Sequence, residues 1–260
     1  MPQGHLLKEF TKDKLKVKVY DTEEEMGRAS AECIAAAILG LKDRDEINVI
    51  LSTARSQEAM FHTLEQRDLP WEKINLFHVD EYIGLPAGDE HRLSHQLLGY
   101  FFRGKKFKNT FFMDPLAHDI DVECKRYEAL LREHALDISL LGIGDNGHLA
   151  FNEPDTADFN DPVWVKRIKI DDVSKNQLYS HGNYASLAEI PDYAFTVTLP
   201  ALMSAPRVIC TVPFKTKAGA VRNTLFGEIS EKCPASIMRR HADALLFLDP
   251  DSASLFPPVY

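Results

Sequence analysis

The chain has 260 residues, 45% of them apolar, so it can bury a sizeable core and is not expected to be disordered. Its formal net charge is −9 and it has no long run of lysine or arginine, which disfavours nucleic-acid and anionic-membrane partners. An anionic ligand would therefore have to be captured locally, by one or two cations and a helix N-terminus.

The sequence shows no sign of export or of membrane insertion. Its first stretch, MPQGHLLKEFTKDKLKV, lacks the apolar core of a signal peptide, and the longest apolar run, IAAAILGL (34–41), is too short to cross a bilayer. No C-x-x-C pair occurs among the cysteines, which are Cys33, Cys124, Cys210 and Cys233. The cysteines are therefore expected to be free thiols in a reducing compartment. We predict a soluble, cytoplasmic protein with no membrane partner. No coiled coil or interface stripe is present, so the sequence leaves the existence of a homo-oligomer open.

Short apolar or β-branched runs recur along the chain and predict strands at residues 15–20, 47–52, 74–80, 110–114, 138–144, 165–170, 194–200, 207–213 and 244–249. Several runs, such as INVIL and ISLLGI, are apolar at successive positions, which is typical of parallel strands buried on both faces. Helical patterns lie between them, at 56–67, 94–103, 121–134 and 215–227 and after Thr22, which is spaced from Glu25 as in a capping box.

This alternation predicts one α/β domain over residues 1–260, with a doubly wound, mostly parallel sheet flanked by helices. The stretch 155–193 is the most irregular and is a candidate lid. Ligands of such sheets bind beyond the carboxyl ends of the strands. Functional residues are therefore expected directly after the apolar runs, and several polar segments lie there.

The first polar segment is LSTARSQEAMF (51–61), in which a strand gives way to a helix through Ser52, Thr53, Ala54, Arg55 and Ser56. Hydroxyls and an arginine at a helix N-terminus suit a phosphate monoester. The segment is not a Walker A loop, because it has neither the glycines nor the Lys-Ser/Thr pair. Plain N-capping by Ser56 is the alternative.

The second segment, HVDEYIGLP (78–86), places Asp80 and Glu81 at a strand end. A carboxylate in a partly dry pocket can have a raised pKa and serve as a base toward a carbon-bound proton. A solvated acidic pair that opens a loop is the alternative.

The third segment, LGIGDNGHLAFNEP (141–154), leaves a strand and carries several glycines, including Gly144. Glycines there let a ligand approach the backbone closely. His148 can exchange a proton with a sugar ring oxygen near neutral pH, and Glu153 could orient that imidazole. The alternative is a tight turn with a surface histidine.

The fourth segment, TVPFKTKAG (211–219), offers Lys217 as a phosphate cation, with Lys215 as a competitor and an exposed helix-start lysine as the alternative. His91 and His95 have the i, i+4 spacing of a metal pair, but no third ligand follows at a useful spacing, so no metal is predicted.

Two of these segments resemble the signature motifs of the glucosamine-6-phosphate deaminase/isomerase family, namely HVDEYIGL and LGIGDNGHLAFNEP. PASIMRRHADALLFLD (234–249) is similar to the C-terminal segment of that family, and AFTVTLPALMSA with Lys217 is similar to its middle. The resemblance spans roughly residues 20 to 250.

The resemblance implies a Rossmann-like α/β sandwich that acts as an aldose–ketose isomerase, converting glucosamine 6-phosphate and water to fructose 6-phosphate and ammonia. It implies neither cofactor nor metal, and an amino-sugar phosphate as the small-molecule partner. By the same resemblance Asp80 moves the proton between C2 and C1, His148 assists ring opening with Glu153 as its carboxylate partner, and Lys217 binds phosphate with the segment 52–56. Glu81 and Gly144, within the signatures, are predicted substrate contacts.

Some positions depart from the family pattern. The family has a T-G-x-T-P loop where this chain has Thr53, Ala54, Arg55, Ser56 and Gln57. Ala54 stiffens the loop, and we hypothesise that Arg55 either supplements phosphate binding or recognises another anionic group. Many members also have a phosphate-binding arginine after the lid, where SKNQLYS (174–180) offers only Lys175 and Gln177. The gluco and galacto epimers of the substrate therefore both remain open.

Asn146 stands where some family members have an aspartate beside the histidine. Its amide can fix the imidazole ring by a hydrogen bond but cannot stabilise imidazolium as a carboxylate does. We therefore count Asn146 among the catalytic residues and predict that Glu153 is the main acidic partner of His148.

Two alternative functions stay open. A 6-phosphogluconolactonase shares the fold, but that family reads D-E-R where this chain has Tyr82 after its acidic pair, and G-H-T-A-S where this chain has GHLAF (147–151). A non-catalytic sugar-phosphate sensor would explain the altered phosphate loop. It would not need the intact set of Asp80, His148 and Glu153.

Overall fold

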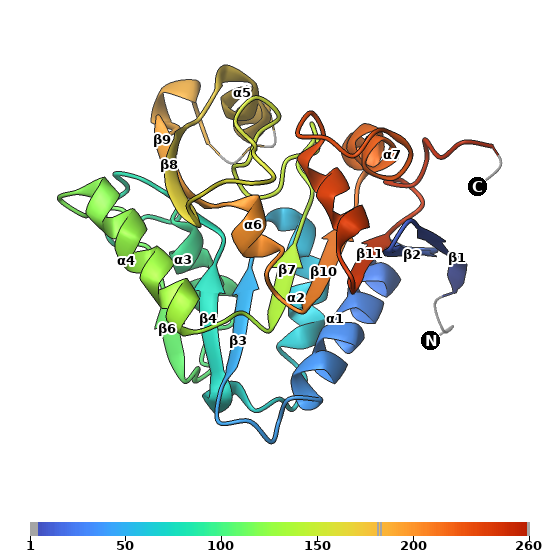
Figure 1. Cartoon of the computed structure of the whole chain (residues 1–260), viewed down its shortest axis with the longest axis horizontal. Coiled ribbons are helices and arrows are strands. Elements are labelled where there is room, and N and C mark those ends of the chain that lie inside the picture. The colour runs from blue at the N-terminus through green and yellow to red at the C-terminus, as the bar shows by residue number, and fades with distance from the viewer. Residues whose placement is uncertain (1–4, 181, 183, 259–260) are drawn as a thin grey trace.

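The computed structural model describes residues 5–180, 182 and 184–258, which form an eight-stranded sheet and a three-stranded sheet with helices around them (Figure 1). The strands are β1 (Leu6–Lys12), β2 (Leu15–Tyr20), β3 (Ile47–Leu51), β4 (Ile74–His78), β5 (Asp80–Tyr82), β6 (Asn109–Phe111), β7 (Ile138–Leu141), β8 (Val165–Lys169), β9 (Tyr193–Val197), β10 (Arg207–Val212) and β11 (Ala244–Leu248). The α-helices are α1 (Glu23–Leu39), α2 (Glu58–Leu64), α3 (Leu93–Gln96), α4 (Ile120–Glu133), α5 (Asp172–Ser180), α6 (Leu199–Leu202) and α7 (Ala218–Phe226).

Shorter helical turns join these elements: η1 (Arg55–Gln57), η2 (Trp71–Lys73), η4 (Leu187–Glu189), η5 (Lys215–Lys217) and η6 (Pro234–Arg240), with a π-helical turn, η3 (Leu97–Phe101), after α3. No helix within the described ranges is long and apolar enough to span a membrane.

The large sheet has the strand order β1-β2-β11-β10-β7-β3-β4-β6. Only the β1–β2 pair is antiparallel, and every other neighbouring pair in this sheet is parallel. From β3 the chain builds outward through β4 to β6, then returns to place β7 on the other side of β3 and continues through β10 to β11. The β3–β7 boundary is thus the point where the strand order reverses, which confirms the predicted doubly wound, mostly parallel sheet.

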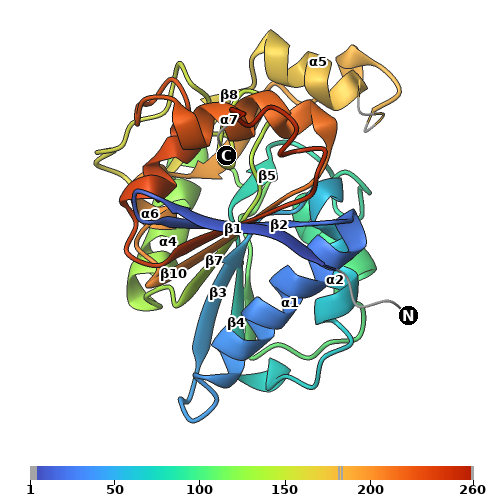
Figure 2. The ribbon, with the colours of Figure 1, turned by 90° about the vertical axis from the view of Figure 1, so that its right-hand side faces the viewer.

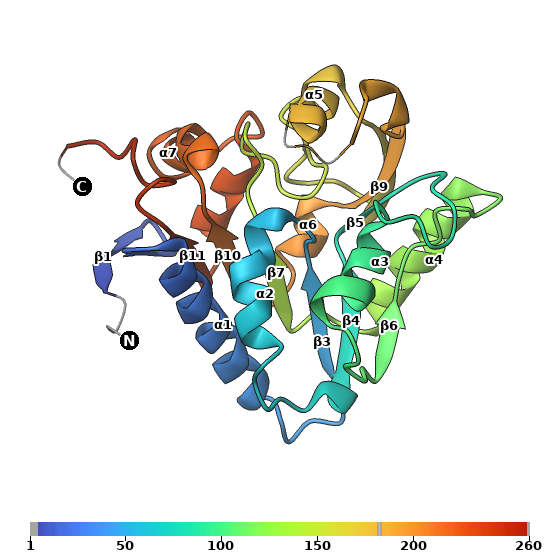
Figure 3. The same ribbon diagram turned by 180° about the vertical axis from the view of Figure 1, so that it is seen from behind.

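Helices cover the two faces of the large sheet, as Figures 2 and 3 show from the side and from behind, and an apolar layer lies between helices and sheet on each face. One layer packs α1, α2 and η3 against residues such as Val49, Leu140 and Ile209. The other packs α4, α6, α7 and η6 against residues such as Ile50 and Leu141. Because neighbours along one strand face opposite layers, the strand runs are apolar at successive positions.

The predicted capping box is half formed. The hydroxyl of Thr22 accepts a hydrogen bond from the backbone N–H of Glu25 at 3.1 Å and begins α1 as expected. The Glu25 carboxylate does not complete the box, because it pairs with Arg28, with 2.7 Å between Oε2 and Nη2.

Three elements differ from the sequence prediction. Strand β1 was not predicted, because every residue of this edge strand is exposed or half-buried and the segment needs no apolar alternation. The run 74–80 divides at Val79, so that β4 ends in the large sheet and β5 begins a second, antiparallel sheet with the order β5-β9-β8. The stretch 155–193 is more regular than predicted, since it carries α5 between the expected strands β8 and β9.

Candidate active site

A cavity of about 770 Å³ is lined by residues that follow the carboxyl ends of β3, β4, β7 and β10 and by residues of α5. Figure 1 shows these strand ends beneath α5. Its wall includes segment 52–56 after β3, Asp80 of β5, Gly142, Gly144 and His148 after β7, and Lys217 after β10. Helix α5 contributes Ser174, Leu178 and Ser180. The topology therefore gathers at the reversal point most of the residues that the sequence places after separate strands.

The segment after β3 forms one end of the cavity, where Ser52, Thr53, Ala54, Arg55 and Ser56 all line the wall. Thr53 is buried, and its hydroxyl has no hydrogen-bond partner among the described residues. Arg55 is exposed at the rim, with its guanidinium carbon 6.0 Å from the centre of the Phe214 ring. The cavity wall therefore includes a hydroxyl that is available to a ligand and a cation in this segment.

Gln57 anchors this segment, a role that the sequence did not predict. Its Nε2 donates to Ser56 Oγ at 3.1 Å and to the carbonyl of Thr211 in β10 at 3.0 Å. The start of the α2 region is thus tied to the strand that precedes Lys217. Only the tertiary structure brings Thr211 beside Gln57, so no local pattern could have indicated this contact.

Asp80 is the first residue of β5 and lines the cavity wall. Burial raises the pKa of Asp80 to about 8, and the adjacent Glu81 carboxylate contributes to the increase. Once ionised, such a carboxylate is a stronger base than a solvated one, as proton abstraction from carbon requires.

Glu81 points away from the cavity, and the structure does not place it where a substrate could touch it. Its Oε1 accepts from the backbone N–H groups of Tyr82 (3.0 Å) and Leu93 (2.9 Å). Its Oε2 accepts from the N–H (3.0 Å) and the hydroxyl (2.6 Å) of Ser94. The predicted substrate contact is therefore replaced by a structural one, because the side chains of adjacent strand residues point to opposite faces.

His148 lines the cavity, and its Nδ1 atom faces two partners behind the wall. Nδ1 lies 2.9 Å from Glu153 Oε1 and 2.9 Å from Asn146 Oδ1. Asn146 Nδ2 donates to Glu153 Oε2 at 2.6 Å, and the Ser174 hydroxyl of α5 donates to Glu153 Oε1 at 2.9 Å. Because Nδ1 is engaged, Nε2 is the ring nitrogen left to exchange a proton with a ligand.

Glu153 is buried and does not line the cavity. Burial opposes its ionisation, but hydrogen bonds from His148, Asn146 and Ser174 outweigh burial and hold the pKa of Glu153 below its usual value. Glu153 and Asn146 thus act on a ligand only through His148. Ser174 was missed by sequence reasoning, because its partner lies 21 residues away in the chain.

Two glycines of the same loop have little room for a side chain. A Cβ atom on Gly144 would lie 2.1 Å from His148 Nε2, so the imidazole lies directly against the glycine backbone. Gly147 has φ +96°, and a Cβ there would lie 2.8 Å from Cys233 Sγ. The glycines therefore serve the placement of the histidine as well as the approach of a ligand.

Gly144→Ala is expected to lower kcat/KM by at least about 100-fold, because the added methyl must displace the His148 ring. Steady-state kinetics with a thermal unfolding curve would measure the effect. Gly219→Ala is the matched control, since a Cβ on Gly219 meets nothing within 4 Å. Unchanged kinetics in Gly144→Ala would contradict the close approach of ring and backbone.

Lys217, the last residue of η5, is buried at the cavity wall. Its Nζ lies 2.5 Å from Asp145 Oδ1. Lys215, the competing candidate, is exposed and does not line the cavity. Asp145 is a further residue that sequence reasoning did not assign to the site.

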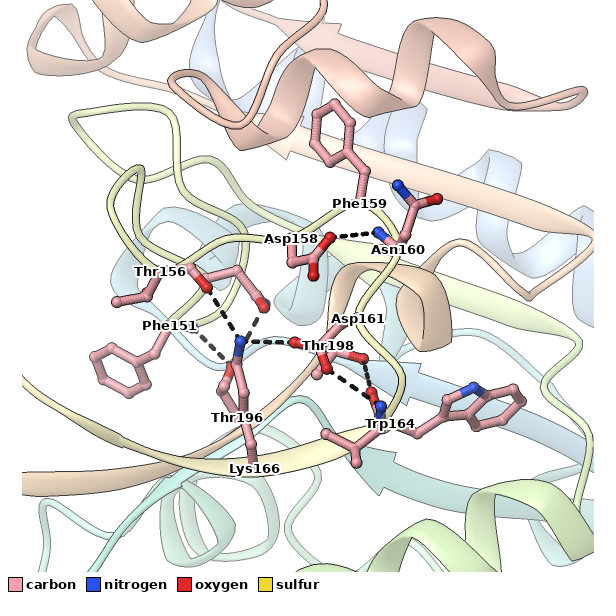
Figure 4. Close-up of polar contacts among 12 residues, drawn as sticks. Phe151, Thr156, Asp158, Phe159, Asn160, Asp161, Trp164, Lys166, Thr196 and Thr198 are labelled. Carbon is pink, nitrogen blue, oxygen red and sulfur yellow. Dashed lines mark hydrogen bonds and ion pairs between the residues drawn. The ribbon is translucent and has the colours of Figure 1, made fainter.

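The sheet β5-β9-β8 fixes Asp80 relative to the His148 loop. Asp80 pairs in register with Thr196 of β9, and the Thr196 hydroxyl accepts the backbone N–H of Phe151 at 3.1 Å. Figure 4 shows this contact beside the loop before β8, where Lys166 Nζ binds Asp161 Oδ2 (2.7 Å) and donates to the carbonyl of Thr156 (3.1 Å). One strand thus connects the two candidate catalytic groups.

Aromatic side chains form another part of the cavity wall. Tyr82, Phe151, Tyr184 and His91 line it, and the rings of His91 and Tyr184 stack with centroids 4.2 Å apart. His91 Nδ1 is 2.9 Å from Asp89 Oδ1, so the histidine that the sequence raised as a metal ligand has a local partner.

Within the candidate lid, Lys175 lies outside the cavity lining. Lys175 Nζ pairs with Asp192 Oδ1 at 2.5 Å. The side chain of Gln177 lies outside the part of the chain that the structure describes. Among the described side chains of α5, those that line the cavity are small or apolar.

Known proteins are similar to this chain in sequence and fold. A family model described as glucosamine-6-phosphate isomerases/6-phosphogluconolactonase matches residues 21–247. A glucosamine-6-phosphate deaminase from Listeria monocytogenes is 32% identical over 212 residues, covering 81% of this chain and 88% of the relative. One from Bacillus cereus is 29% identical over 241 residues, covering 93% and 89%.

Solved structures agree. A monomeric glucosamine-6-phosphate deaminase superposes with a TM-score of 0.84 at 29% identity, covering 92% of this chain and 99% of that one. A 6-phosphogluconolactonase from Thermotoga maritima gives a TM-score of 0.72 at 19% identity, covering 91% and 100%, which supports the fold alone. With its doubly wound sheet and a family match over most of its length, the chain belongs to the glucosamine-6-phosphate isomerase/6-phosphogluconolactonase family.

Proposed function

We propose that this protein is an amino-sugar phosphate isomerase and deaminase that converts glucosamine 6-phosphate and water to fructose 6-phosphate and ammonia. Relatives named glucosamine-6-phosphate deaminase, which are 29–32% identical to this chain, support the reaction. The observation that carries the proposal for the site is the meeting of Asp80, His148 and Lys217 around one cavity.

In the proposed mechanism, His148 acts first, through Nε2. As the sugar ring opens, the ring oxygen gains a proton and the hydroxyl on C1 loses one. An imidazole held at Nδ1 by Glu153 and Asn146 is suited to pass that proton.

Asp80 then acts on the open amino aldose. Its carboxylate takes the proton from C2, which gives an enolamine, and returns it to C1, which leaves an imine at C2. Water replaces the nitrogen and ammonia leaves. The amino group of the bound substrate, as a cation beside Asp80, favours the ionised carboxylate even though burial raises the pKa of Asp80 to about 8.

The phosphate would lie at the other end of the cavity, between segment 52–56 and Lys217. Its binding energy positions C1 and C2 against Asp80 without taking part in the chemistry. The buried hydroxyl of Thr53 is a donor for one phosphate oxygen, and Lys217 and Arg55 supply positive charge.

A coupled assay for fructose 6-phosphate and ammonia, started from glucosamine 6-phosphate, tests the proposal. The galactosamine epimer and 6-phosphogluconolactone are run beside it. No turnover of either amino sugar would sink the proposal. Lactone hydrolysis would favour the lactonase alternative, and ligand-induced thermal stabilisation without ammonia release would favour a sensor.

Arg55→Ala is expected to raise KM for the phosphorylated substrate by about 5- to 20-fold with kcat within about threefold, because a charge-assisted contact to phosphate is lost. Lys215→Ala is the control, since it removes an exposed cation that does not line the cavity. An unchanged substrate affinity in Arg55→Ala would refute a role of Arg55 in phosphate binding.

A further inference from the structure

The ion pair between Lys217 and Asp145 joins two loops at the phosphate end of the cavity. Lys217 follows β10 and Asp145 follows β7, and their Nζ and Oδ1 atoms are 2.5 Å apart with side-chain exposures of 9% and 30%. Among the described residues, Arg55 forms no ion pair within 4 Å. The two cations at this end therefore differ, because among the described residues Lys217 is paired with a carboxylate and Arg55 is not.

We propose that Asp145 is a positioning residue that competes with the phosphate of the substrate for Lys217, and that it thereby sets the affinity of the site for phosphate. This inference rests on the proposed function, in which Lys217 is the phosphate cation. It adds to that function a regulating residue that the family resemblance did not indicate.

Charge and burial lead to this competition. A largely buried ammonium without a counter-ion is unfavourable, so Asp145 stabilises Lys217 when no substrate is bound. A phosphate dianion brought to the same ammonium lies close to the Asp145 carboxylate, and like charges at that separation repel. The phosphate must therefore weaken the Lys217–Asp145 pair, and its affinity is lower than it would be without Asp145. A sugar without a phosphate has no charge with which to displace Asp145.

The position of Asp145 in the chain connects this exchange to His148. The next residue, Asn146, accepts the backbone N–H of His148 at 3.1 Å and donates to Glu153 Oε2 at 2.6 Å. A shift of Asp145 away from Lys217 therefore acts on the loop that orients the imidazole. Binding of phosphate would in this way change the position of His148, the candidate ring-opening residue.

The test measures binding of inorganic phosphate by calorimetry, without turnover. Asp145→Asn is expected to lower the dissociation constant of phosphate by about 3- to 10-fold at low ionic strength, and Asp145→Glu is expected to stay near wild type. The difference should shrink as salt is added, because screening weakens the repulsion. Asp145→Ser serves as a second neutral variant if Asp145→Asn does not fold.

Glu90→Gln is the matched control, because it removes a negative charge from the same cavity at a residue that is not paired with Lys217. If Glu90→Gln raised the phosphate affinity as much as Asp145→Asn, the effect would come from the net charge of the cavity and not from the pair with Lys217, and the proposal would be overturned. Unchanged or weaker phosphate binding in the neutral Asp145 variants would also overturn it.

Failure of the proposed function gives a different pattern. If neither amino sugar is turned over but the neutral variants bind phosphate more tightly, the competition between Asp145 and phosphate is supported and the proposed deaminase reaction is contradicted. If turnover is found, KM for the phosphorylated substrate should fall in Asp145→Asn in parallel with the phosphate constant. Turnover with no gain in phosphate affinity would overturn the inference alone.

Discussion

Asp80→Asn is expected to reduce kcat/KM at least about 1,000-fold, because the proposed proton transfer between C2 and C1 loses its base. The same substitution is expected to stabilise the protein. Burial raises the pKa of Asp80 to about 8, so the ionised carboxylate is unfavourable in the fold, and asparagine mimics the neutral acid. A stabilising change that removes activity would mark a group whose strain serves the reaction.

The pH dependence follows from the raised pKa. A base must be deprotonated, so kcat/KM of the wild type should rise with pH up to about 8, and this limb should be absent from the residual activity of the variant. The stability that Asp80 contributes in its protonated form is complete below its unfolded-state pKa of 3.8 and is lost as pH rises toward about 8.

The effect on stability is measured by thermal unfolding. The free energy of unfolding of Asp80→Asn should exceed that of the wild type by only a small margin near pH 5. At pH 9 the difference should reach about 1–3 kcal/mol after allowance for the partial exposure of Asp80 to the cavity. Glu81→Gln is the contrasting control, because it weakens hydrogen bonds to Leu93 and Ser94 and should destabilise the fold. Destabilisation by Asp80→Asn at pH 9 would contradict the unfavourable burial.

The two adjacent carboxylates also show what the sequence could and could not reveal. The position of Asp80 and Glu81 after an apolar run indicated a candidate site, because ligands of doubly wound sheets bind beyond the carboxyl ends of the strands. The sequence could not show which carboxylate faces the cavity, since that depends on β5 leaving the large sheet to pair with β9. Register with a strand more than 100 residues away assigns Asp80 to the cavity and Glu81 to the start of α3.

The same distinction explains the other differences. The glycine-rich loop and segment 52–56 were recognisable because local composition marks both. Ser174 and Asp145 were not, because their importance lies in contacts with Glu153 and Lys217 that long-range folding creates. The strand β1 was missed for a related reason: an exposed edge strand needs no apolar alternation, so it leaves no pattern.

Glu153→Gln is expected to lower kcat by about 10- to 100-fold and to shift the pH–rate profile. A carboxylate 2.9 Å from Nδ1 orients the His148 ring through a charge-assisted hydrogen bond, which a neutral amide does not provide. Hydrogen bonds that outweigh burial hold the pKa of Glu153 below its usual value. The ionised Glu153 therefore contributes to stability above pH 4.5, and this contribution is lost only as pH falls through the lowered pKa. The stability of Glu153→Gln should accordingly not show this decrease at acid pH.

Asn146→Asp is the decisive comparison, because it adds a carboxylate where Glu153→Gln removes one. Asn146 Nδ2 lies 2.6 Å from Glu153 Oε2, so aspartate at 146 would bring two carboxylates into contact. Such a pair shares a proton, and the net charge that faces His148 near neutral pH stays close to that of Glu153 alone. The pH–rate profile should therefore shift less in Asn146→Asp than in Glu153→Gln. The opposite ranking would show that the residue at 146, and not Glu153, controls the charge of the imidazole.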